Sequence, residues 1–243
     1  MRDFATMVLC LLLVAPVSAS ELRIAVASNF APALKQIKSA FEKQFNVSVI
    51  MIKGSTGKLF AQIVHGAPYD IFMAADSYRP AVLEQKKLIT SGSRYTYAIG
   101  QIALWAPTTN TSALQSLNTQ AFKRLAIANP KTAPYGKAAI EVMQHLKVYK
   151  QNRNKLVLGE NVAQVFQFIQ SGNVQLGFIA YPDVNRHKIK HYWLPEIKTY
   201  TPLNQQLVIL KRSDKQQLAK RFTQFLQHEN TQHTIKQHGY LIP

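Results

Sequence analysis

Four short polar turns in this 243-residue sequence carry groups suited to binding a small anion. They span residues 27–30, 53–57, 130–136 and 160–162, and each is rich in small hydroxyl or amide residues, or in the glycine and proline that bend the backbone. Hydroxyl and backbone N–H groups donate hydrogen bonds without carrying a charge, and a helix N-terminus adds the positive end of a dipole. A single serine or asparagine in such a turn is more often an ordinary helix N-cap. The repetition across four turns is what favours a site for a desolvated oxyanion.

The elements around these turns alternate between predicted strands and helices. Runs of β-branched and aliphatic residues indicate the strands, and apolar residues three or four positions apart indicate the helices. A first set has strands at 22–26, 47–52 and 70–75 and helices at 34–45, 57–65 and 80–88. A second set has strands at 124–129, 155–159 and 174–181 and helices at 136–149 and 161–170. This order predicts parallel α/β sheets, in which ligands bind beyond the carboxyl ends of the strands, where all four turns fall.

The remaining elements connect the two sets. A long apolar run, residues 98–107, lies between them, and a predicted strand at 205–210 and a helix at 214–227 follow the second set. No Gly/Ser linker separates the sets, so the sequence predicts two lobes joined by a double crossover as a hinged pair.

The N-terminal residues have the layout of a secretory signal peptide. Arg2 provides a basic start, an apolar stretch follows, and small residues precede a cleavage point near Ala19. The only cysteine, Cys10, lies inside the apolar stretch and not at the cleavage point, so no lipid anchor is expected. An exported mature chain would therefore have no disulfide, no thiolate metal site and no thiol nucleophile.

The charge of the chain is strongly basic, with 29 Lys and Arg against 12 Asp and Glu, a net charge of +17. This balance raises the possibility of a nucleic acid partner. The excess is spread over both sets of elements, without a run of five basic residues or a nucleic-acid-binding motif, so we expect no nucleic acid partner. The charge can instead attract a small dianion and speed its capture.

No catalytic pattern is convincing. The segment 54–58, GSTGK, has Ile52 and Leu59 where a phosphate-binding loop needs glycine and a hydroxyl residue. Asp70 and Asp76 flank a strand with no histidine base nearby in the sequence, which indicates a cap or a hydrogen bond near the hinge. We therefore predict that the protein is not an enzyme.

A metal site formed by histidines is the remaining alternative to an anion site. His187 and His191 are four residues apart, a spacing that can hold a metal on a helix. The intervening HKIKH segment is basic, which favours an exposed surface. A metal-binding periplasmic protein stays open as a distant alternative.

Three motifs resemble those of the periplasmic molybdate-binding proteins, the substrate-capturing components of molybdate ABC importers. They are AVASNFAPALKQI, KGSTGKLFAQIVHGAPYDIFMAADSYRP and NPKTAPYGKAA, within a resemblance that runs from about Glu21 to Tyr240. The resemblance implies a type II periplasmic-binding-protein fold, with two α/β lobes joined by a two-stranded hinge and a ligand cleft between them. It divides the chain into a signal peptide (1–19), a first lobe (20–102 plus 203–243) and a second lobe (103–202).

The resemblance also implies the ligand site. The ligand would be molybdate or tungstate, held from the first lobe by Ser28, Asn29 and Ser55 and from the second by Tyr135 and by the backbone N–H of Val162.

Some members of the family place a ligand tyrosine at the end of a later strand. Here LGFIAYP puts Ala180 at that position and Tyr181 one residue on, which turns its side chain to the other face, so Tyr135 is preferred.

The resemblance further implies a periplasmic monomer that delivers its ligand to an ABC permease, without a cofactor or resident metal. A binding protein for another oxyanion, such as sulfate or phosphate, is the main alternative.

Overall fold

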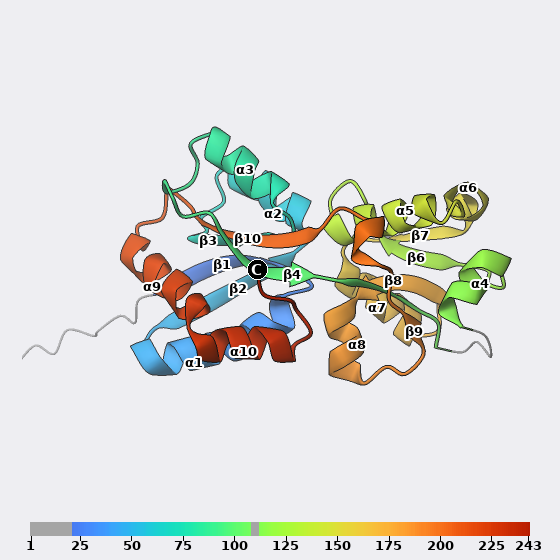
Figure 1. The fold of residues 1–243 in the computed structure, drawn as a ribbon. Helices are drawn as coiled ribbons and strands as arrows, with labels where there is room; N and C mark the ends of the chain where they lie inside the picture. The colour runs from blue at the N-terminus through green and yellow to red at the C-terminus, as the bar shows by residue number, and fades with distance from the viewer. Residues whose placement is uncertain (1–20, 108–111) are drawn as a thin grey trace, which may run out of the picture.

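The computed structural model describes residues 21–107 and 112–243. The signal peptide predicted at residues 1–19, with Cys10, lies outside the described residues. The described part of the chain forms two five-stranded sheets with their helices, lying side by side (Figure 1). We name the unit around the first sheet lobe 1 and the unit around the second sheet lobe 2.

Lobe 1 is a mixed sheet covered by helices on both faces. Its strands are β1 (Glu21–Ala27), β2 (Ser48–Gly54), β3 (Ile71–Met73), β4 (Tyr95–Gly100) and β10 (Leu203–Ile209). Its helices are α1 (Ala31–Phe45), α2 (Thr56–Val64), α3 (Tyr78–Gln85), α9 (Gln216–Gln227) and α10 (Glu229–Gln237). The strand order is β2-β1-β3-β10-β4, with β1 parallel to both neighbours and β10 antiparallel to both of its own. Alternate side chains of β1 pack on opposite faces: Ile24 and Val26 against α1, α9 and α10, and Ala25 against α2 and α3.

Lobe 2 repeats this arrangement in smaller form. Its strands are β5 (Ile102–Trp105), β6 (Leu125–Ala128), β7 (Leu156–Gly159), β8 (Leu176–Ala180) and β9 (Tyr192–Trp193). Its helices are α4 (Ala113–Thr119), α5 (Pro134–His145), α6 (Tyr149–Asn152), α7 (Val162–Gln170) and α8 (Tyr181–His187), with short 3₁₀ turns at Arg153–Lys155 and Ile197–Thr199. The order β7-β6-β8-β5-β9 matches that of lobe 1 position by position, with an antiparallel crossover strand in fourth place.

The chain crosses between the lobes twice, and the two crossings are adjacent. Gln101 alone separates β4 from β5 on the way out, and the return enters β10 at Leu203. Leu203 pairs with Gly100, which places both crossings side by side. The predicted α/β fold of two lobes with a two-stranded connection is confirmed, while the boundaries predicted at residues 102 and 202 stay predictions.

Most predicted bounds differ from the observed ones by up to three residues, and two segments differ more. The apolar run at residues 98–107 is divided between β4 and β5 because the chain changes sheet at Gln101. The helix predicted at 136–149 ends at His145, because Lys147 adopts a left-handed conformation with φ of 59°, and α6 then starts afresh. Residues 181–199 hold short elements that the sequence analysis does not predict.

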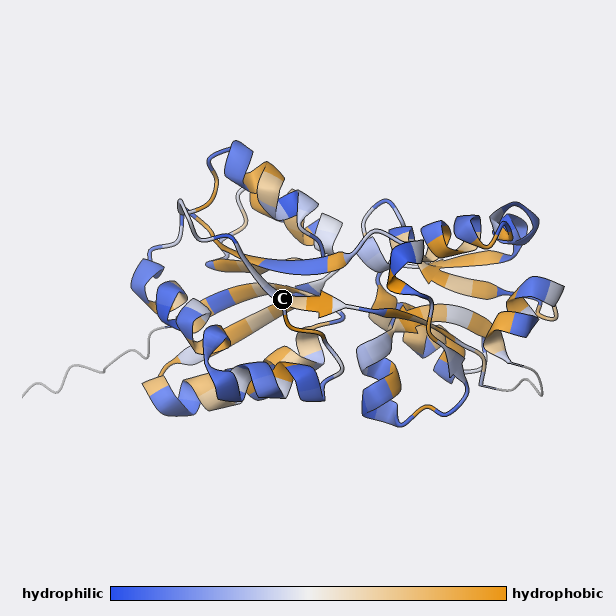
Figure 2. Ribbon diagram, viewed as in Figure 1, coloured by the Kyte–Doolittle hydropathy of each residue, from blue (hydrophilic) through white to orange (hydrophobic). Residues whose placement is uncertain are grey.

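Hydrophobic residues follow the sheets and the inner sides of the helices, and polar residues lie on the outside (Figure 2). Each lobe has its own buried core, and Ala27 and Ala75 of lobe 1 pack in the core cluster of lobe 2. Across the described residues, no helix is long and apolar enough to cross a membrane.

Candidate functional site

A small cavity lies where the four predicted turns meet between the lobes. It includes all five residues predicted to bind the ligand, together with their neighbours. Its lining is Ala27, Ser28, Asn29, Gly54, Ser55, Thr56, Ala75, Ala133, Pro134, Tyr135, Asn161 and Val162. The carboxyl ends of β1, β2, β6 and β7 therefore converge on one point from both lobes.

The size of the cavity limits what it can hold. The centres of water-sized atoms have about 10 Å³ of space in it. Pockets for organic ligands usually offer roughly 300–1,000 Å³. The cavity therefore suits an ion of a few atoms and is too small for a sugar or an amino acid.

Two serines of lobe 1 present hydroxyl groups to this cavity. Ser55 is the N-cap of α2 and is 2% exposed, and its Oγ has no hydrogen-bond partner among the described residues. Ser28 uses its backbone N–H for a 3.0 Å hydrogen bond to the Gly54 carbonyl, so its hydroxyl is the donor that remains. A buried hydroxyl without a partner costs about 1–3 kcal/mol, which a ligand acceptor can offset.

Asn29 faces the cavity differently from the serines. Its side-chain Nδ2 donates to Gln205 Oε1 at 2.8 Å and to Tyr240 Oη at 3.2 Å, both within lobe 1. Its backbone N–H has no acceptor in the part of the chain that the structure describes. The donor that Asn29 can offer to a ligand is therefore the main-chain N–H.

Lobe 2 contributes one phenol and one helix N-terminus. The Tyr135 side chain is 2% exposed, and its hydroxyl has no hydrogen-bond partner within the described ranges. Burial raises the pKa of Tyr135 well above its usual value, with smaller contributions from Tyr240, Tyr200 and Asp183, so the phenol stays protonated and can donate. Val162 is the first residue of α7, where backbone N–H groups have no partner inside the helix.

Tyr181, the alternative to Tyr135, does not line the cavity. It begins α8 directly after β8, its backbone N–H donates to the Gln101 carbonyl at 2.9 Å, and its ring packs near Tyr192.

The lobes touch each other around the cavity. The Gly57 N–H at the start of α2 donates to the Thr132 carbonyl at 2.7 Å, and Arg79 Nη2 donates to the Lys131 carbonyl at 3.2 Å. A more exposed ion pair joins Lys58 and Glu160 at 2.9 Å. The structure thus has the lobes closed over the cavity.

A large cleft, about 1,010 Å³, adjoins the cavity and shares Ser28 and Asn161 with it. Lys35 and Lys53 stand exposed on the lobe 1 wall and form no ion pair with any described residue. On the opposite wall, Arg186 is paired with Asp183 at 2.6 Å. The cleft is therefore a basic approach to the cavity, and its unpaired charge comes from lobe 1.

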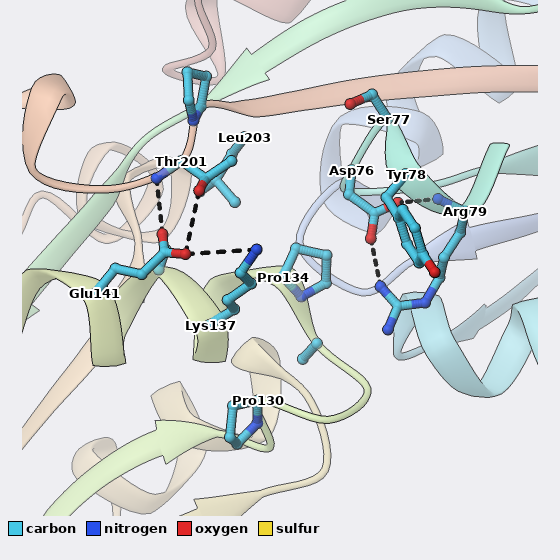
Figure 3. A pocket seen from close by; sticks show the side chains of 13 residues that line it. Asp76, Ser77, Tyr78, Arg79, Pro130, Pro134, Lys137, Glu141, Thr201 and Leu203 are labelled. Atoms are coloured by element: carbon cyan, nitrogen blue, oxygen red, sulfur yellow. Dashed lines mark hydrogen bonds and ion pairs between the residues drawn. The ribbon is translucent and has the colours of Figure 1, made fainter. Parts of the chain in front are cut away.

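A second pocket between the lobes, about 320 Å³, is lined by residues of α3, of α5 and of the segment that leads into β10 (Figure 3). Its charges are already paired: Arg79 bonds to Asp76, and Lys137 to Glu141. It offers no unpaired charge to a small ion.

Several side chains considered in the sequence have structural roles. Asp70 accepts hydrogen bonds from the Arg23 N–H and the Ser213 hydroxyl, and Asp76 accepts from the Arg79 N–H at the start of α3. No cluster of three or more histidine, cysteine or acidic side chains suited to a metal occurs in residues 21–107 and 112–243.

Sequence reasoning missed four residues around the site. Thr56 and Ala75 line the cavity, with the Ala75 N–H bonded to Thr56 Oγ1 at 3.1 Å, and Thr56 had a visible signal in its position beside Ser55. Gln205 and Tyr240 hold Asn29 but lie 176 and 211 residues from it, and no local pattern marks them.

The chain is similar over most of its length to known binding proteins. Residues 22–241 match the family model described as bacterial extracellular solute-binding protein. The chain is 38% identical to the molybdate-binding protein ModA of Azotobacter vinelandii over 94% of this chain and 93% of that protein. It is 36% identical to ModA of Rhodobacter capsulatus, covering 93% and 90% respectively. The solved structure of the Azotobacter vinelandii periplasmic molybdate-binding protein superposes with a TM-score of 0.87 at 33% identity, over 91% of this chain and 99% of that one.

Proposed function

This chain belongs to the family of bacterial extracellular solute-binding proteins, and from that premise we propose that it captures molybdate and delivers it to an ABC importer. It is a binding protein and not an enzyme. The molybdate-binding relatives that it resembles over most of its length are binding proteins too. The ligand is transported cargo and undergoes no chemistry in the cleft.

One observation carries the proposal. The Ser55 hydroxyl from lobe 1 and the Tyr135 hydroxyl from lobe 2 are buried at the same small cavity, and neither has a partner among the described residues. Two neutral donors facing one cavity from opposite lobes match an acceptor-only ligand that the lobes enclose. In our proposal Ser28, Asn29, Ser55, Tyr135 and Val162 hold the oxyanion.

Neutral donors and helix N-termini suffice to hold a dianion in such a site. The N-terminal ends of α2, α5 and α7 lie at this cavity, and their dipoles favour negative charge there. No lysine or arginine lines the cavity itself. A paired cation is therefore not needed to compensate the ligand charge.

The choice among oxyanions depends on size. Molybdate, tungstate and sulfate are doubly charged tetrahedral acceptors, so the same donors serve all three. Molybdate and tungstate have longer bonds to oxygen than sulfate and require a larger cavity. The strong similarity to two molybdate-binding proteins favours molybdate, with tungstate as a second ligand and sulfate or phosphate as the alternative.

The proposal extends to the location and the partner. We expect a periplasmic protein whose signal peptide is cleaved near Ala19, acting as a monomer, with residues 20–102 plus 203–243 as one moving lobe and 103–202 as the other. The partner is the membrane permease of the importer.

A panel of anions tests the ligand. Thermal unfolding of the purified mature protein is followed with molybdate, tungstate, sulfate, phosphate and a divalent metal salt. A ligand raises the midpoint by an amount that grows with its concentration. We expect molybdate and tungstate to stabilise and the others to have little effect. Stabilisation by sulfate or phosphate with no response to molybdate would refute the proposed ligand.

A further inference from the structure

A buried hydrogen-bonded cluster in lobe 1 holds Asn29 from three distant parts of the chain. It consists of Asn29, Tyr97 on β4, Gln205 on β10 and Tyr240 after α10, and we name it the Asn29 cluster. Each of the four residues is at most 5% exposed. Phe30 packs edge-on against both tyrosine rings, with ring centroids 4.6 Å from Tyr97 and 5.2 Å from Tyr240.

The contacts of the cluster fix Asn29 at both its side chain and its backbone. Asn29 Nδ2 donates one hydrogen bond to Gln205 Oε1 at 2.8 Å and another to Tyr240 Oη at 3.2 Å. The Tyr240 hydroxyl in turn donates to the Asn29 carbonyl at 2.8 Å. Gln205 Oε1 also accepts from the Tyr97 hydroxyl at 3.2 Å, which holds the glutamine side chain in place.

These contacts leave one donor of Asn29 for the cavity. Both hydrogens of its side-chain amide are used inside lobe 1, and its carbonyl is held by Tyr240. Its backbone N–H has no acceptor among the described residues, and Asn29 lines the cavity. The cluster therefore fixes the orientation of a main-chain donor.

The cluster meets lobe 2 at the crossing between the lobes. A Cβ atom on Gly100 would lie 2.4 Å from the Tyr135 hydroxyl and 2.8 Å from Gln205 Nε2. Because glycine has no Cβ, both side chains can lie against the backbone at this position. Both atoms are buried without a partner among the described residues. Gln205 thus bonds to Asn29 of lobe 1 and lies close to Tyr135 of lobe 2.

We infer that Gln205 and Tyr240 are positioning residues of the oxyanion site, orienting the Asn29 N–H toward the ligand before the lobes close. The inference rests on the proposed function, because it assigns these residues to the same site. Neither residue lines the cavity, so they act through Asn29. A donor held in place loses less freedom on binding than a mobile one, which strengthens binding.

Removal of one hydroxyl tests this role. Tyr240→Phe keeps the ring and its contact with Phe30 but removes both hydrogen bonds to Asn29. The matched control is Tyr69→Phe, because Tyr69 is a lobe 1 tyrosine whose hydroxyl donates a hydrogen bond to Gln62 Oε1 at 3.0 Å and takes no part in the cluster or the cavity. Gln205→Met serves as a second variant, since it keeps the length of the side chain and removes the acceptor for Asn29.

Two measurements separate positioning from a general structural role. Calorimetric titration with molybdate should show binding about three- to tenfold weaker for Tyr240→Phe and Gln205→Met, and unchanged for Tyr69→Phe. In ¹⁵N-resolved spectra of the ligand-free protein, Tyr240→Phe should shift the Asn29 amide resonance, whereas Tyr69→Phe should leave it in place.

The outcomes distinguish this inference from the proposed function. If the unmodified protein does not bind molybdate, the proposed function fails, while the Asn29 amide shift still reports on the cluster. If the unmodified protein binds and both cluster variants bind equally well, the positioning role is wrong. Equal losses in Tyr240→Phe and Tyr69→Phe would also overturn it, because the effect would then follow from the loss of any hydrogen-bonded tyrosine hydroxyl in lobe 1.

Discussion

Lobes 1 and 2 share a strand order but prepare their donors for the ligand in different ways. In lobe 1, Asn29 is held by Gln205 and Tyr240, and Thr56 fixes the Ala75 N–H at the cavity wall. In lobe 2, the Tyr135 hydroxyl has no partner within the described residues. The unpaired lysines of the approach also belong to lobe 1. The Ser55 hydroxyl of lobe 1 is equally without a partner among the described residues, so the difference lies in the held Asn29 and in the unpaired lysines. We therefore expect lobe 1 to receive the anion first and lobe 2 to complete the site on closure.

This difference indicates an order of events. An anion that enters the basic cleft meets charges and fixed donors on lobe 1 first. Closure then brings in Tyr135 and the N-terminus of α7, which exclude water from the ligand.

The largest effect is expected for Gly57→Ala, which acts on the contact between lobes. A Cβ atom here would lie 2.8 Å from the Thr132 Cα and 2.9 Å from its carbonyl oxygen, so the lobes must separate. We expect molybdate affinity to fall about a hundred- to thousandfold, ~3–4 kcal/mol, by calorimetry. The ligand-free protein should be no less stable, because alanine is favoured over glycine in a helix by about 1 kcal/mol. Unchanged affinity would mean that closure does not need this contact.

The next largest effect is expected for variants that each remove one hydrogen-bond donor, and their rates of association and dissociation distinguish the roles of the two lobes. Ser28→Ala and Ser55→Ala in lobe 1 and Tyr135→Phe in lobe 2 each remove one donor, and we expect each to weaken binding by about 1–3 kcal/mol. If lobe 1 binds first, Tyr135→Phe should raise the dissociation rate and leave the association rate unchanged in stopped-flow measurements. A slower association in Tyr135→Phe than in Ser55→Ala would reverse the proposed order. Full affinity in both serine variants would contradict the assigned site.

Alkaline pH should weaken both lobes through their buried tyrosines. Burial raises the pKa of Tyr97 and Tyr240 in lobe 1 and of Tyr135 in lobe 2 well above the usual value. The unfolded chain loses these protons at about pH 10 while the folded chain keeps them. Stability is therefore full below about pH 10 and falls as the pH rises beyond it toward the folded-state pKa values. Urea unfolding between pH 8 and 11, roughly the range around that value, should show a weaker pH dependence in Tyr97→Phe and in Tyr135→Phe.

A smaller, kinetic effect is expected from the lysines of the approach. Lys35→Gln and Lys53→Gln should slow association with molybdate by a few-fold at low salt, and the difference should vanish at high salt. Lys220→Gln is the matched control, because this exposed lysine of α9 has the same charge but lies outside the cleft. An equal decrease in the control would assign the steering to net charge alone.

The smallest effect belongs to the ion pair between Lys58 and Glu160, whose side chains are 55% and 44% exposed. Such exposed pairs contribute about 0.2–1 kcal/mol. A double-mutant cycle with Lys58→Ala and Glu160→Ala should give a coupling energy in that range for ligand binding. A larger value would identify the pair as a main element of closure.

Local patterns account for much of the fold and for the placement of the predicted site. Strand and helix periodicity predicts the α/β lobes, and each of the five proposed ligand residues follows a strand, so topology alone brings them to one cavity. The division of residues 98–107 at Gln101 and the left-handed Lys147 depend on tertiary contacts and have no clear sequence signal. Gln205 and Tyr240 were missed for the same reason, because only the folded chain brings them to Asn29.

The place of β10 in the sheet has a consequence for folding. Lobe 2 takes all its strands from one continuous segment, residues 102–193, so its sheet can form from that segment alone. Lobe 1 has β10 between β3 and β4, and this strand comes after the whole of lobe 2. Contacts between residues so far apart form slowly, because a long loop must close first. We therefore expect lobe 2 to fold first and the Asn29 cluster to assemble last, so that the chain gains its ligand-binding competence only in the final step of folding.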